Sequence, residues 1–118
     1  MGVSDAPPPE ETLALLGDEY ARAILIATRS EPMTADALAE ALDAAPSTVY
    51  DRIDDLTGAG FLSEVTRTDD RGNHYAEYRA RLDRLGLELT DEGFELAVSH
   101  RDRDETAARL HALWSDLR

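Results

Sequence analysis

Hydrophobic residues in the first quarter of the chain recur every three or four positions, the spacing of one face of an α-helix. The pattern starts at Thr12 and predicts one helix that ends at Glu31-Pro32, because a residue before proline disfavours helical backbone. Its apolar positions are Leu13, Leu16, Tyr20, Ala23, Ile24 and Ala27. Further apolar residues between positions 15 and 26 widen this surface, so we expect the helix to lie between the core and a partner subunit.

Two shorter helical patterns follow, separated by three residues. Thr34 is a good N-cap for the first, and Pro46 suits the first position of the second, which closes at Gly58. The apolar positions are Leu38 and Leu42 in the first helix and Val49, Ile53 and Leu56 in the second. Two short helices joined by a turn at 43–45 are typical of a helix-turn-helix motif.

The hydrophobic period then changes from about 3.6 to 2, which indicates strands. Residues 61–68 and 74–82 predict a hairpin, with a turn at 69–73 that contains Gly and Asn for positive φ. Residues 85–89 and 94–98 alternate in the same way and predict a second hairpin. A final helix is expected from about Arg101 to Leu117, with a narrow apolar seam at Ala107, Leu110, Trp114 and Leu117.

This order of elements predicts an α+β fold: a winged helix-turn-helix with an added β-hairpin and a C-terminal dimerisation helix. We expect a disordered N-terminus over 1–9, the winged helix-turn-helix over 10–85, and the second hairpin with the final helix over 86–118.

Composition narrows the function classes. The chain has 118 residues and no cysteine, which excludes disulfides, thiolate metal sites and cysteine nucleophiles. No apolar run approaches the roughly 20 residues that span a membrane, and the first residues lack a signal-peptide pattern, so we expect a cytoplasmic protein without a membrane partner.

Charge is the strongest compositional signal. The net charge is −13, all 12 basic residues are arginine, and lysine is absent. Many carboxylates without lysine indicate a protein adapted to high salt, because a large net charge is tolerable when the Debye length is only about 3 Å at 1 M salt.

Candidate DNA contacts lie on the second helix of the motif and on the following hairpin. A recognition helix presents its polar side to the major groove, while arginines on a hairpin contact phosphates. The predicted DNA-binding residues are Ser47, Thr48, Tyr50, Asp51, Arg52, Arg67, Arg71, Asn73, His74 and Arg79. Solvated salt bridges between strands are the alternative for each arginine, and Arg71 is the best candidate because it lies in the turn.

Three segments resemble the winged helix-turn-helix transcription regulators of haloarchaea, those of the ArsR-like type. Residues 16–22 resemble the opening of their first helix, 46–53 their recognition helix, and 72–75 their wing. The resemblance covers residues 12–85 and implies a homodimeric transcription regulator that binds double-stranded DNA. The PadR-like group is similar in build, so both groups stay open.

Two positions depart from this family pattern. Ala45 stands where Ser or Thr commonly caps the recognition helix, and Asp51 stands where a basic residue is common. From Thr34 to Gly58 the chain has six acidic residues and one basic residue, Arg52. We therefore hypothesise that loosely held monovalent cations bridge these carboxylates to DNA phosphates, with no other cofactor.

Dimerisation is predicted from the two ends of the chain. The expected interface residues are Leu13, Leu16, Tyr20, Leu110, Leu113, Trp114 and Leu117. Two DNA half-sites favour a two-fold dimer, whereas the alternative is that the final helix folds back onto the first helix of its own chain.

No motif supports catalysis or a metal site. Gly58 and Gly60 end a helix rather than open one, and the spacing of His100 and His111 keeps them apart on a helix. The alternatives to a DNA-binding regulator are a winged-helix protein-interaction module without DNA binding, and a regulator that senses a ligand between its first and last helices.

Overall fold

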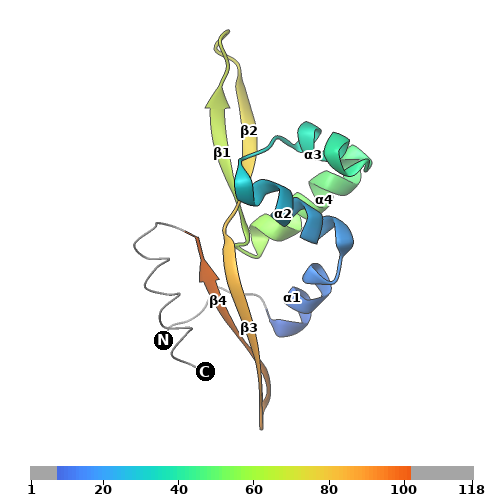
Figure 1. The fold of residues 1–118 in the computed structure, drawn as a ribbon, viewed down its shortest axis with the longest axis vertical. Coiled ribbons are helices and arrows are strands. Elements are labelled where there is room, and N and C mark those ends of the chain that lie inside the picture. The colour runs from blue at the N-terminus through green and yellow to red at the C-terminus, as the bar shows by residue number, and fades with distance from the viewer. Residues whose placement is uncertain (1–7, 102–118) are drawn as a thin grey trace.

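The computed structural model describes residues 8–101, which form four helices and two antiparallel two-stranded sheets (Figure 1). The elements are α1 (Pro9–Leu16), α2 (Glu19–Ser30), α3 (Ala35–Leu42), α4 (Pro46–Gly58), β1 (Leu62–Thr68), β2 (His74–Ala80), β3 (Leu82–Thr90) and β4 (Gly93–His100). The two hairpins extend in opposite directions from the helices. The predicted α+β class, the helix-turn-helix and both hairpins are confirmed, whereas the predicted C-terminal helix lies outside the described residues.

The single first helix predicted from the apolar pattern is wrong, because two helices occupy this stretch. Helix α1 ends at Leu16, and Asp18 leaves helical conformation with φ −84° and ψ 128°. The Asp18 carboxylate then accepts a hydrogen bond from the Ala21 N–H at 2.8 Å, which caps α2. A competing cap, rather than a loss of apolar residues, therefore breaks the helix. The helix also begins earlier than predicted, with Pro9 in its first turn.

The helix-turn-helix has the predicted bounds. The Thr34 hydroxyl caps α3 by accepting a hydrogen bond from the Ala37 N–H at 3.1 Å, and the chain turns over 43–45 before α4 begins at Pro46. Asp43 adopts the left-handed region at φ 53° so that its N–H and that of Ala44 can bond to carbonyls of α3.

The core lies between these helices and the first hairpin. Side chains from all of α2, α3, α4 and β1 contribute, and the fully covered ones include Ile24, Leu38, Val49, Leu56 and Phe61. Three residues of α4 at helical spacing supply its centre, as the pattern predicts. The packing of these three residues against the core determines which side of α4 faces outward.

The first hairpin is tied to the helices through a short backbone bridge. β1 pairs with β2 from Leu62 opposite Ala80 to Thr68 opposite His74. Met33, between α2 and α3, exchanges two backbone hydrogen bonds with Tyr78 on β2, at 2.7 and 3.0 Å. This hairpin therefore has the position of a wing beside the helix-turn-helix, and we call it the wing.

Candidate nucleic-acid interface

The exposed side of α4 carries the predicted recognition residues. Val49, Ile53 and Leu56 face the core, so the side of α4 opposite to them faces outward. Ser47 and Asp51 are exposed, Thr48 is half-buried, and Tyr50 is 49% exposed. No side chain caps the N-terminus of α4, because Ala45 has no acceptor. The hydroxyl groups on this side are thus accessible to a groove of DNA.

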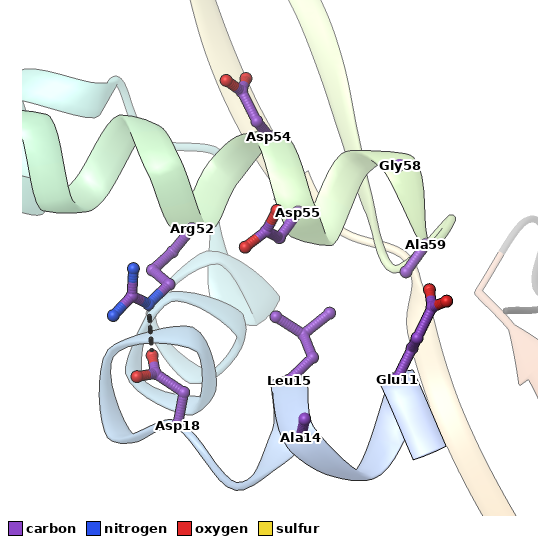
Figure 2. Close-up of a pocket in the computed structure, with 9 residues that line it drawn as sticks. All are labelled: Glu11, Ala14, Leu15, Asp18, Arg52, Asp54, Asp55, Gly58 and Ala59. Atoms are coloured by element: carbon purple, nitrogen blue, oxygen red, sulfur yellow. Dashed lines mark hydrogen bonds and ion pairs between the residues drawn. The ribbon is translucent and has the colours of Figure 1, made fainter. Parts of the chain in front are cut away.

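Arg52 points away from this exposed side and is engaged elsewhere (Figure 2). Its Nε donates to Asp18 Oδ2 at 2.8 Å, and its Nη1 donates to Asp51 Oδ2 at 2.7 Å. The hydrogen bond from Arg52 lowers the pKa of the Asp18 carboxyl, and the Ala21 N–H lowers it further. Arg52 was predicted to contact DNA. In the structure, this one basic residue of the helix-turn-helix instead links α4 to the α1–α2 junction.

A pocket of about 640 Å³ lies beside this ion pair, between α1 and α4. Figure 2 shows Leu15 rising from α1 toward α4, with the Asp55 carboxylate above it and Glu11 beside Ala59. Apolar and acidic side chains therefore line the same space, on the side of α4 away from the wing.

The tip of the wing is organised by one carboxylate. Asp69 Oδ1 accepts hydrogen bonds from the N–H groups of Asn73 at 2.8 Å and Arg71 at 2.9 Å. These bonds, led by that from Asn73, lower the pKa of Asp69. Gly72 takes φ +84°, which closes the turn. The turn presents the side chains of Arg71 and His74 to solvent at the end of the hairpin.

The wing arginines differ in what they contact. Arg67 Nε donates to Glu77 Oε1 at 2.9 Å across the strands, which is the salt bridge weighed as the alternative in sequence analysis. Within residues 8–101, no ion pair of 4.0 Å or less involves Arg71 or Arg79, and both are exposed. Arg71 and Arg79 are therefore the predicted arginines with guanidinium groups available to a phosphate.

A cleft of about 350 Å³ lies between α4, the start of α3 and the wing. Tyr50 of α4 and Tyr75 of β2 line it together with Thr34 and Ala35 at the start of α3. Tyr78 forms its buried wall, and burial raises the pKa of this phenol, with Glu64 adding to the effect. Tyr75 was not among the predicted DNA contacts, although its outward place in the alternation of residues 74–82 pointed to it.

The predicted dimer residues are only partly described. Leu13 is 44% exposed on α1, while Leu16 and Tyr20 are half-buried. The other predicted contacts, Leu110, Leu113, Trp114 and Leu117, lie outside the described residues. Over residues 8–101, no group of three metal-ligating side chains forms, and none of the helices has the length and apolar character to cross a membrane.

Comparison with known proteins agrees with this geometry. No curated protein matches the chain. Residues 16–65 match a family model described as a helix-turn-helix domain, a range that covers α2, α3, α4 and the start of β1. Residues 16–65 are therefore similar in sequence to a helix-turn-helix domain, and the structure places α3, the turn at 43–45 and α4 within this range.

Proposed function

We propose that this protein is a transcription regulator that binds double-stranded DNA with α4 in the major groove and the wing tip on the neighbouring phosphates. One juxtaposition carries this proposal. The exposed hydroxyl side of α4 lies beside a wing whose tip holds a guanidinium without a partner among the described residues. A helix-turn-helix reads DNA with such a helix, and phosphate contacts position it.

Selection from a pool of random DNA duplexes tests the proposal. An enriched duplex, labelled for fluorescence anisotropy, then reports the affinity of variants. Arg71→Ala is expected to weaken binding to all duplexes and to make the slope of log affinity against log salt concentration more positive by about 1, because one phosphate contact is lost. Arg67→Ala is the matched control, because its guanidinium is paired with Glu77. No enriched duplex, or equal losses for both variants, would contradict the assignment.

The acidic surface of α4 calls for a specific mode of binding. Asp51, Asp54 and Asp55 are exposed, although Asp51 shares Arg52 with Asp18 and Asp55 lies over the pocket beside α1. We propose that monovalent cations bridge these carboxylates to DNA phosphates at high salt. Affinity is then expected to stay flat or rise between about 0.1 M and about 2 M KCl, whereas ordinary phosphate contacts weaken steeply. A monotonic fall in affinity rules out cation bridging.

The same acidic surface favours a second candidate, a winged-helix module that binds a protein. Between Thr34 and Gly58 the exposed charges are all carboxylates apart from the engaged Arg52. This candidate predicts that selection enriches no duplex at any salt concentration.

We further propose a homodimer whose two-fold axis matches two half-sites in DNA. The proposed interface includes α1 and α2, where Leu13 and Ile26 are 44% and 73% exposed. Leu13→Asp is expected to halve the mass measured by light scattering, while Ala41→Asp on the exposed side of α3 leaves it unchanged.

A further inference from the structure

One face of the second hairpin is lined by apolar side chains from Leu85 to Leu89 and from Phe94 to Val98. Three pairs of residues lie directly opposite each other on this face: Leu85 and Val98, Leu87 and Leu96, and Leu89 and Phe94. Leu85 and Val98, at the base, pack against the core. Toward the tip, Leu87, Phe94 and Leu89 are 42%, 52% and 71% exposed. We call these six residues the hairpin face.

The hairpin face requires a cover. None of its residues is charged, although the chain as a whole has 25 acidic residues. The opposite side of the same hairpin has a different character, with Glu88 opposite Glu95. A two-stranded hairpin in water is marginally stable without a layer packed on it. The exposed end of the hairpin face is therefore a candidate docking surface.

We propose that the chain's own C-terminal segment, residues 102–118, packs on the hairpin face. This segment follows β4 directly, and the Arg101 N–H donates to the Arg81 carbonyl at 2.6 Å at the base of the hairpin. Its apolar residues recur at helical spacing and share one side of the predicted helix. They are Ala107, Leu110, Leu113, Trp114 and Leu117.

The dimensions of the two surfaces agree. As a helix, residues 107–117 extend about 15 Å at 1.5 Å per residue. The hairpin face extends about 13 Å from Leu85 to Leu89 at roughly 3.3 Å per residue. The five residues 102–106 reach up to about 17 Å when extended, which is enough for the chain to turn back toward the tip.

Tethering favours this segment over a second copy of the chain. A short flexible link gives a tethered segment an effective concentration in the millimolar range. The segment has three arginines and four acidic residues, so it brings little repulsion to the acidic hairpin. This inference is independent of DNA binding, and it assigns Trp114 a contact within its own chain.

Trp114 is the only tryptophan, so its fluorescence reports on this contact in the full-length chain. Leu89→Asp and Phe94→Asp are expected to shift Trp114 emission to longer wavelength and to increase its quenching by acrylamide. Ala97→Asp is the matched control, because Ala97 is exposed on the opposite side of the hairpin. Circular dichroism verifies that each variant is folded. Unchanged emission in both hairpin-face variants would overturn the proposal.

Absence of cysteine from the chain allows a second test. Under mild oxidation, the double variant Leu89→Cys/Leu110→Cys is expected to form a disulfide within one chain. Mass spectrometry is then expected to find the mass of a monomer in which neither cysteine reacts with an alkylating reagent. Ala97→Cys/Leu110→Cys is expected to remain reduced. A disulfide-linked dimer would show that a second copy covers the hairpin face, and no disulfide in either pair would equally refute the assignment.

Discussion

Asp18 stabilises two junctions with one carboxylate. Its Oδ2 accepts the Ala21 N–H that starts α2, and the same oxygen accepts the Arg52 Nε–H from α4. Because both donors favour the charged form, they lower the pKa of Asp18 in the folded protein. Protonation of this residue therefore opposes folding.

The sign of this effect sets a pH window. A carboxyl whose pKa is lowered on folding stabilises the folded state above its unfolded pKa, near 3.8, and this stabilisation is lost as pH falls toward the lower folded value. Asp18→Asn is expected to keep the cap through its amide oxygen and to lose part of the acid dependence. Thermal melting from about pH 6 to about pH 2 in both proteins measures the difference.

The matched control for this prediction is Asp36→Asn, which changes an exposed carboxylate in the first turn of α3. If Asp18→Asn and the wild type lose thermal stability in parallel as pH falls, the Arg52 contact has no thermodynamic role.

Asp43 provides a second prediction at a single residue. Its left-handed backbone is unfavourable for a side chain with Cβ, although Asp tolerates it better than most residues. Asp43→Gly is expected to raise the free energy of unfolding by about 0.5–1 kcal/mol, because glycine adopts this conformation freely. Urea denaturation measures the change, and Asp43→Ala should be less stable than the wild type. A loss of stability in Asp43→Gly contradicts this view.

Sequence reasoning was accurate for buried residues and less so for charged ones. Spacing alone identified Val49, Ile53 and Leu56 as the inward side of α4, and all three are buried. Spacing gives no information about Arg52, whose partner Asp18 is 34 residues away. The partner of a long charged side chain depends on which residues the folded chain brings close to it.

At the scale of elements, the N-terminus of α4 is the weakest helix start in the motif. α3 has a side-chain cap, and α4 has none. Ala45→Ser is expected to stabilise the protein by about 1 kcal/mol, because its hydroxyl can accept an N–H of the first turn. Thermal and urea unfolding measure the gain. Ala41→Ser, at an exposed position inside α3, is the control and is expected to be neutral or slightly destabilising.

Among the predicted elements, the first helix was wrong in its extent. Apolar periodicity continues through Gly17, so a single helix was the natural prediction. The break depends on Asp18 outcompeting the helix for an N–H, and periodicity does not report on that competition. Both hairpins were predicted well, since their turns contain residues suited to tight reversal and their strands alternate clearly.

For the whole molecule, net charge governs the response to salt. A charge of −13 on a 118-residue chain opposes compaction, and salt screens that repulsion. The midpoint of urea unfolding is expected to rise as KCl increases from about 0.1 M to about 2 M. Urea is uncharged, so it leaves ionic strength under control. A midpoint independent of KCl would argue against adaptation to high salt.

The sequence predicted which two elements form the candidate interface, but it predicted only some of the residues that line it. The exposed side of α4 and the wing tip follow from periodicity and turn chemistry. The cleft between them, lined by Tyr50 and Tyr75, depends on how the wing is placed against α3, which local sequence does not specify. For the same reason, the exposed half of the hairpin face emerged only from the three-dimensional arrangement.

The backbone bridge between Met33 and Tyr78 fixes the wing relative to the helices. In the proposed complex, α4 and the wing would then approach DNA as one rigid unit, so the wing meets phosphates at a fixed distance from the bases that α4 reads. Because phosphates recur along DNA whatever its sequence, changing the base pairs under the wing should leave the affinity unchanged, whereas changing those under α4 should lower it.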